Sequence, residues 1–341
     1  MYVIPMNKRK SEYYNKSYNI LLPLVFLLGL VMGILFKSIF PSQQDSQFAQ
    51  TRENGYEYIN PLIDFETLQP TTIKKYVELE DEVSQYISEK EKDREVFHIS
   101  FYYKDLNSGA WIGIDENEKF IPASLNKVPL MIALYKKEMK SPGFLQTKLK
   151  YIYSNENDIL TQAIKPEFYL ESGKEYSIEE LIDQLIIYSD NSVLEILYST
   201  ISDKEGQDIF YELGISNPYE FGGLQNSMSV KEYSSFFRIM YNASYLNKEL
   251  SSKALGLLTN TKFDSGIKAG VPDTIKVANK FGERNFADEN EEDSSQIHDC
   301  GIVYFLPKPY LLCIMTKGSN PTKQIEVIKA ISTIVYNGVS K

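Results

Sequence analysis

Two side chains near position 125 have the types and spacing needed for nucleophilic catalysis. Ser124 and Lys127 stand three residues apart, so they share one face of any helix that contains them. Pro122 and a following run of helix formers predict that Ser124 lies in a first helical turn, where free backbone N–H groups favour a developing negative charge. A desolvated amine beside a hydroxyl can act as its general base. Taken alone, the pair also fits an N-capping serine with a solvent-facing lysine.

A second motif, Ser189-Asp190-Asn191, lies between two segments of apolar helical periodicity. We interpret it as the junction of two buried helices. The Ser189 hydroxyl could relay a proton there, and the Asn191 amide could hold a substrate carbonyl. An ordinary turn with Asp190 as an N-cap explains the same residues.

A third motif, Lys280-Phe281-Gly282, ends a strand-like run. Its functional interpretation gives Lys280 the role of a fixed positive charge for a substrate carboxylate. Gly282 would then allow a close approach of the substrate backbone. A lysine at this place is also typical of an exposed edge strand that avoids aggregation.

The elements that must position these motifs divide into two groups. Strand-like runs cover 96–103, 110–114, 274–281, 297–306 and 310–316, and apolar periodicity predicts helices over 71–92 and 324–336. The interval 123–260 reads as helices and loops only. We therefore expect an α/β (α+β) fold, in which a five-stranded antiparallel sheet carries the terminal helices beside an all-helical lobe.

In this order the three motifs resemble the class A β-lactamase and penicillin-binding-protein superfamily, and within it the class A β-lactamase-like serine hydrolases. The resemblance covers roughly residues 95–338. It implies that Ser124 is acylated by a β-lactam or a D-alanyl peptide, that is, by a peptidoglycan-type small substrate. It implies no cofactor.

The resemblance also implies a role for each site residue. Lys127 would be the base, Ser189 the proton shuttle, and Asn191, Lys280 and Gly282 the substrate contacts. The backbone N–H groups of the nucleophilic serine and of Glu283 would form the oxyanion hole.

Two departures from the family pattern bear on function. Phe281 replaces a Thr or Ser whose hydroxyl helps to bind the substrate carboxylate, and the loss of one such bond weakens recognition by about 1.5–3 kcal/mol. The E-x-x-L-N segment that supplies the deacylating glutamate is absent. Glu220 is the only acid in the interval 213–226, so it is the candidate deacylation base, although its spacing does not match.

Three functions fit these residues. The first is a membrane-anchored extracytoplasmic serine hydrolase resembling class A β-lactamases. The second is a D-Ala-D-Ala carboxypeptidase or another peptidoglycan peptidase, and the third is a catalytically silent cell-wall-binding module. A net charge of -10 argues against a nucleic-acid partner. The two histidines, His98 and His298, lack a ligand cluster, so no metal site is expected.

The N-terminal residues predict a membrane anchor. A charge-free apolar segment of about 20 residues can span a bilayer, and the basic residues before it keep the N-terminus inside. We expect a cytoplasmic tail over 1–16, a transmembrane signal anchor over 17–40, a linker over 41–70, and an extracytoplasmic hydrolase domain over 71–341 at the bacterial cell membrane. A cleaved signal peptide is the alternative.

The two cysteines, Cys300 and Cys313, flank the turn-like sequence Pro307-Lys308-Pro309. If that turn centres on Lys308, the two side chains lie on opposite faces of the sheet. The sequence therefore predicts free thiols.

Overall fold

The computed structural model describes residues 47–52, 55–68, 73–92, 95–152, 169–215, 227–288 and 291–341. The chain divides into two compact units, 1–46 and 47–341, and every described residue lies in the second. The expected tail and anchor therefore lie outside the described residues. Within the described ranges, no helix combines the length and the apolar character that crossing a bilayer requires.

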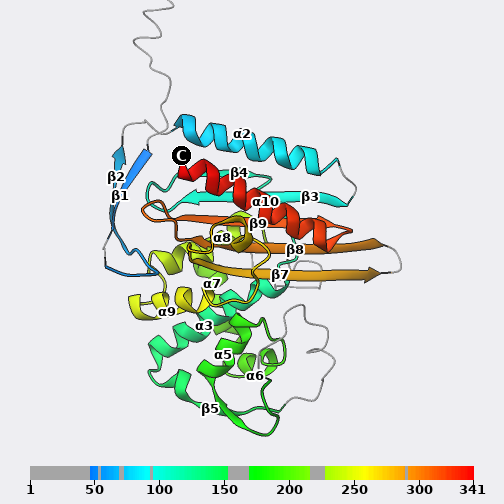
Figure 1. Cartoon of the computed structure of the whole chain (residues 1–341). Coiled ribbons are helices and arrows are strands. Elements are labelled where there is room, and N and C mark those ends of the chain that lie inside the picture. The colour runs from blue at the N-terminus through cyan, green and yellow to red at the C-terminus, as the bar shows by residue number, and fades with distance from the viewer. Residues whose placement is uncertain are drawn as a thin grey trace, which may run out of the picture. The chain divides into compact units, whose positions relative to one another are not determined.

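A five-stranded antiparallel sheet forms the centre of the second unit, in the order β4-β3-β9-β8-β7 (Figure 1). Its strands are β3 (Val96–Asp105), β4 (Trp111–Ile114), β7 (Val277–Asp288), β8 (Glu291–Val303) and β9 (Tyr310–Gly318). Strands from both ends of the chain thus meet in one sheet. The predicted fold class is confirmed.

Both faces of the sheet are covered, because alternate side chains of a central strand enter two different apolar cores. Along β9, Leu311, Cys313 and Met315 join the core of the helical lobe. Their neighbours join a core beneath the two terminal helices, α2 (Ile73–Lys90) and α10 (Pro321–Ser340). These helices pack side by side along the sheet in Figure 1, where the sequence expects them.

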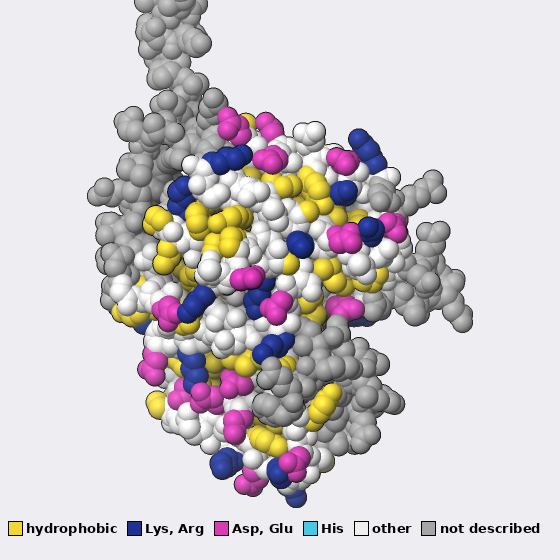
Figure 2. All heavy atoms as spheres, in the orientation of Figure 1, with side chains coloured by type: hydrophobic (Ala, Val, Ile, Leu, Met, Phe, Trp, Pro, Cys, Tyr) yellow, Lys and Arg dark blue, Asp and Glu magenta, His cyan; other side chains and the backbone are white. Residues whose placement is uncertain are grey.

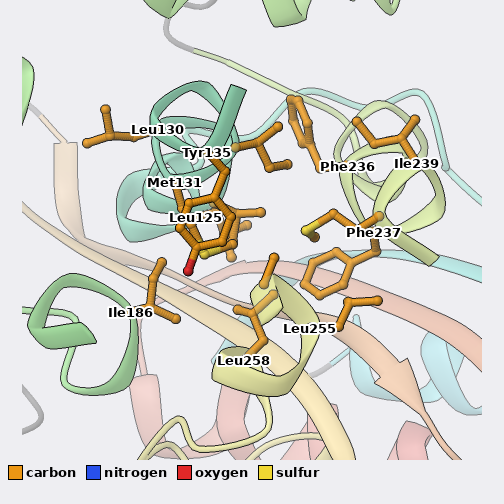
Figure 3. Packing of buried hydrophobic residues seen from close by; sticks show 14 of the residues in the cluster. Leu125, Leu130, Met131, Tyr135, Ile186, Phe236, Phe237, Ile239, Leu255 and Leu258 are labelled. Atoms are coloured by element: carbon orange, nitrogen blue, oxygen red, sulfur yellow. The ribbon is translucent and has the colours of Figure 1, made fainter. Parts of the chain in front are cut away.

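The helical lobe contains α3 (Lys127–Lys140), α5 (Ile178–Ile187), α6 (Leu194–Tyr198), α7 (Asp203–Glu212), α8 (Val230–Tyr241) and α9 (Lys248–Leu258). A serine and a glutamate three residues later form capping boxes that start α5, α7 and α8. Side chains from α3, α8 and α9 meet in one apolar core, among them Met131, Phe237 and Leu255 (Figure 3). The lobe thus gives α3 a rigid support.

Short elements complete the unit. The 3-10 turns are η1 (Ala123–Asn126), η2 (Phe144–Gln146) and η3 (Lys268–Gly270). The strands β5 (Lys148–Lys150) and β6 (Glu175–Ser177) pair within the lobe, so the expectation of helices and loops only over 123–260 is wrong at this point. On the face seen in Figure 2, acidic and basic side chains are interspersed.

The segment expected as a linker over 41–70 contains structure of its own. The strands β1 (Gln47–Arg52) and β2 (Leu62–Leu68) pair antiparallel. Between them, Ile59 is buried, the Asn60 N–H donates to the Tyr241 carbonyl at 2.7 Å, and the Tyr304 hydroxyl donates to the Tyr58 carbonyl at 2.8 Å. The compact unit therefore begins well before the expected boundary at residue 71.

The prediction of free thiols is wrong, because Cys300 and Cys313 form a disulfide. In the β8–β9 hairpin Val303 pairs with Tyr310, so the turn centres between Leu306 and Pro307 and not on Lys308. This register places the two cysteines directly opposite each other, with their Cα atoms 4.0 Å apart. Both side chains then point into the core of the helical lobe.

Candidate active site

Ser124 lies in η1, which continues directly into α3. The predicted helical first turn is thus present, in 3-10 form. The Leu125 N–H donates to the Pro122 carbonyl at 3.0 Å and closes this turn. Ala123 has a φ of 49°, a left-handed conformation that costs a non-glycine residue about 1–2 kcal/mol. Such strain beside a half-buried serine is common at functional sites.

Lys127 brings the first two motifs together. Its Nζ donates to the Ser189 carbonyl, to Ser189 Oγ at 3.0 Å and to Asn191 Oδ1 at 2.6 Å. None of these three acceptors belongs to Ser124. The amine is almost fully buried, with 3% of the residue exposed.

Burial lowers the pKa of Lys127 to about 7, and the negative charge of Asp190 partly opposes this shift. An ordinary lysine is almost entirely protonated at neutral pH. Here a large fraction of the Lys127 amine is neutral at pH 7, and a neutral amine can accept a proton.

Ser189 connects all three motifs. Its Oγ accepts hydrogen bonds from Lys127 and, at 2.9 Å, from Lys280 Nζ. Like Ala123, Ser189 adopts a left-handed conformation, with a φ of 56°. A hydroxyl has two acceptor lone pairs and one hydrogen, so Ser189 can serve both lysines and still donate.

Lys280 differs from the expected open positive charge. The residue has no exposed surface, and its Nζ also donates to the Phe281 carbonyl at 3.1 Å. Burial lowers the pKa of Lys280 well below its ordinary value, the charge of Lys127 lowers it further, and Asp299 partly compensates. Lys280 therefore donates a hydrogen bond to Ser189 from below the cleft and is not among its described lining residues.

Phe281 is buried as well. Its ring stacks on Phe263, with centroids 4.5 Å apart and planes 14° apart. Instead of crowding the entrance of the cleft, the side chain that replaces the family hydroxyl fills an apolar space.

Gly282 has a structural role that the sequence interpretation missed. A Cβ atom at this position would lie 2.6 Å from the Pro122 carbonyl oxygen and 3.0 Å from Leu125 Cγ. The missing side chain thus lets β7 contact the turn that carries Ser124, and the close approach is made by the protein's own backbone.

Two β8 side chains that sequence reasoning did not select hold the residue before Pro122. Gln296 Oε1 accepts from the Ile121 N–H at 2.9 Å, and His298 Nε2 donates to the Ile121 carbonyl at 3.0 Å. Burial lowers the pKa of His298 to about 4, so its ring is neutral. No local sequence signal reveals this contact, because the partners lie more than 170 residues apart.

A cleft of about 400 Å³ opens over these residues. Its described lining consists of Ala123, Ser124, Asn126, Lys127, Asn191, Leu194, Tyr198, Glu283 and Arg284. The structure therefore brings Ser124, Lys127, Asn191 and Glu283 to one cavity, with Ser189 behind it. Glu220 lies outside the described residues.

The chain matches the β-lactamase enzyme family over residues 78–339. Among solved structures it is similar to a class A β-lactamase from Mycobacterium abscessus, with 21% identity, a TM-score of 0.64, and coverage of 77% of this chain and 100% of the other. PBP-A has 20% identity, a TM-score of 0.63, and coverage of 77% and 96%, respectively. A β-lactamase from Xanthomonas campestris has 22% identity, a TM-score of 0.63, and coverage of 76% and 98%. The family match covers more than half of the chain, and the chain therefore belongs to the β-lactamase enzyme family as a β-lactamase-like serine hydrolase.

Proposed function

We propose that this hydrolase forms an acyl-enzyme on Ser124 with β-lactams or D-alanyl peptides. The observation that carries the proposal is the buried Lys127, which has a pKa of about 7 and is bonded to Ser189 beside the cleft that Ser124 lines. This arrangement supplies a nucleophile, a neutral base and a relay hydroxyl within one site.

In the proposed acylation, neutral Lys127 takes the Ser124 proton while Oγ attacks the substrate carbonyl carbon. The backbone N–H groups of Ser124 and Glu283 stabilise the resulting oxyanion. Ser189 then passes a proton from Lys127 to the leaving nitrogen, the C–N bond breaks, and the acyl group stays on Ser124. Lys127 ends the step neutral again.

We further propose that release of a β-lactam acyl group is slow. Among the described residues that line the cleft, the one carboxylate belongs to Glu283, and the family's E-x-x-L-N segment is missing from the sequence. A PBP-A variant has been solved as an acyl-enzyme with penicillin G, so a related fold can hold such an adduct. A persistent adduct would favour the peptidase function over an efficient β-lactamase.

Intact-mass spectrometry after exposure to benzylpenicillin tests the proposal. We expect one adduct per chain, its absence in Ser124→Ala, and persistence for many minutes after free penicillin is removed. Rapid return to the unmodified mass would instead indicate efficient β-lactam hydrolysis. If neither β-lactams nor an activated serine probe modify the protein, acyl transfer is overturned in favour of a silent wall-binding module.

We also propose that residues 17–40 anchor the chain, with the hydrolase domain outside the bacterial cell membrane. The apolar segment and its preceding basic residues support this orientation. The Cys300–Cys313 disulfide fits it, since such bonds persist in oxidising compartments. Protease added to intact spheroplasts should digest the domain of the full chain, whereas a domain that becomes sensitive only after lysis would contradict the orientation.

A further inference from the structure

The edge strand β7 passes the turn that carries Ser124 at Gly282. The residues two positions before and two positions after Gly282 face the same way as it does. Side chains two apart in a strand lie on one face, so Lys280, Gly282 and Arg284 share the face that meets η1. Lys280 lies about 7 Å along the strand on one side of Gly282, and Arg284 lies the same distance on the other. The strand therefore places one basic side chain on each side of Gly282.

These two basic side chains differ in their access to substrate. Lys280 is fully buried and bonded to Ser189, whereas Arg284 is exposed and lines the cleft. Among the described lining residues the cations are Lys127 and Arg284, and Lys127 is the buried amine assigned as the base. A guanidinium stays charged at every physiological pH. Among the described lining residues, Arg284 therefore presents an exposed guanidinium to the cleft.

The position of the relay hydroxyl decides which half of the substrate meets this charge. Ser189 is bonded to Lys280, so protonation of the leaving group takes place on the Lys280 side of Gly282. The acyl half, which stays attached to Ser124, then extends toward Arg284.

We propose that Arg284 is a specificity-determining residue that binds an acidic group on the acyl half of the substrate. A planar guanidinium can donate two parallel hydrogen bonds to a carboxylate. The inference rests on the proposed acyl transfer and adds a substrate class to it. Glu283 also lines the cleft, but it is adjacent to Arg284 along β7, so its side chain lies on the opposite face of the strand.

Three penicillins that share one nucleus compare a neutral, a basic and an acidic group at this place. Benzylpenicillin has a neutral acyl side chain, ampicillin carries an amino group on the same carbon, and carbenicillin carries a carboxylate there. Second-order acylation rate constants would be measured by intact mass on the full chain in detergent, for wild type, Arg284→Gln and Arg284→Lys. Arg238→Gln is the matched control, because Arg238 is an exposed α8 residue outside the lining of the cleft.

We expect carbenicillin to acylate the wild type faster than benzylpenicillin does, and ampicillin more slowly. In Arg284→Gln the carbenicillin to benzylpenicillin rate ratio should fall about five- to tenfold, as for one partly solvated charged hydrogen bond. Arg284→Lys should keep part of the preference, and Arg238→Gln all of it. A ratio is insensitive to the fraction of folded protein, so partial misfolding of a variant does not obscure the result.

Adducts from all three compounds with a ratio that Arg284→Gln leaves unchanged would overturn the role of Arg284 alone. A wild-type preference for ampicillin over carbenicillin would also overturn it. No adduct with any of the three, together with no reaction with an activated serine probe, would overturn the proposed acyl transfer and, with it, this inference.

Discussion

The two sides of the cleft differ in how closely they follow the family pattern. On the helical side, Lys127, Ser189 and Asn191 keep the expected residue types and are joined by hydrogen bonds to the Lys127 amine. On the strand side, Phe281 replaces a hydroxyl residue and stacks on a second ring, and Arg284 brings a charge into the cleft.

Burial explains this contrast. The Lys127 amine and the Ser189 hydroxyl are buried, so each must find a partner, and a change in one would leave the other unsatisfied. On the strand side, Arg284 is exposed, so solvent can satisfy whatever replaces it, and the buried Phe281 ring has no polar group that needs a partner. The proposed proton-transfer residues can therefore be kept while the residues on the strand side change.

The largest effect should come from Lys127→Met on the helical side, which removes the proposed base but keeps the length of the side chain. Acylation by benzylpenicillin should fall about 10²- to 10⁴-fold. The wild-type rate should rise with pH through about 7, because the deprotonated amine is the active form. Stopped-flow or mass measurements between about pH 5.5 and 8.5 would show this rise in the wild type and in Lys140→Met, an exposed control on α3. A similar rise in Lys127→Met would refute the assignment of the base.

The next effect tests the point where the two sides touch. Gly282→Ala places a methyl group 2.6 Å from a backbone oxygen, so the turn that carries Ser124 must shift. We expect a loss of acylation of about 10- to 100-fold, the size of a 1 Å misplacement. Gly206→Ala on α7, where the nearest atom is 3.6 Å away, should leave the rate unchanged. Equal rates in both variants would mean that η1 tolerates the displacement.

A third experiment restores the family residue on the strand side. Phe281→Thr and Phe281→Val have nearly the same shape and lose the same ring stack, so each should lower the unfolding free energy by about 2–4 kcal/mol. Only threonine regains the hydroxyl. If that hydroxyl reaches the substrate carboxylate, the threonine variant should acylate about tenfold faster than the valine variant. Equal rates would show that the strand side no longer uses this position.

The smallest effect on catalysis should come from the disulfide that joins β8 and β9. Replacing both Cys300 and Cys313 with alanine should lower the unfolding free energy by about 2–4 kcal/mol, while acylation changes less than about twofold because neither cysteine is among the described residues that line the cleft. Denaturant unfolding and the penicillin assay measure the two quantities. Free thiols in unfolded, unreduced wild type would remove the basis of this prediction.

Local motifs account for what the sequence could predict. Ser124 and Lys127 are one helical turn apart, and the strand and helix periodicities place the sheet and the terminal helices correctly. The sequence predicted the hairpin turn between β8 and β9 but not its centre. A shift of the centre by one or two residues changes every residue pair in the hairpin, and the turn residues alone do not fix it. The Gln296 and His298 contacts with Ile121 could not be predicted, since they depend on how distant strands dock.

Both sulfur atoms of the Cys300–Cys313 bond belong to side chains with no exposed surface. A reductant in the surroundings cannot reach them until the sheet opens. The redox state of this pair is therefore set while the chain folds, and it does not change as long as the sheet stays closed. The state of the Cys300–Cys313 pair in a folded molecule therefore reflects the compartment in which the chain folded, and not the compartment in which it is later found.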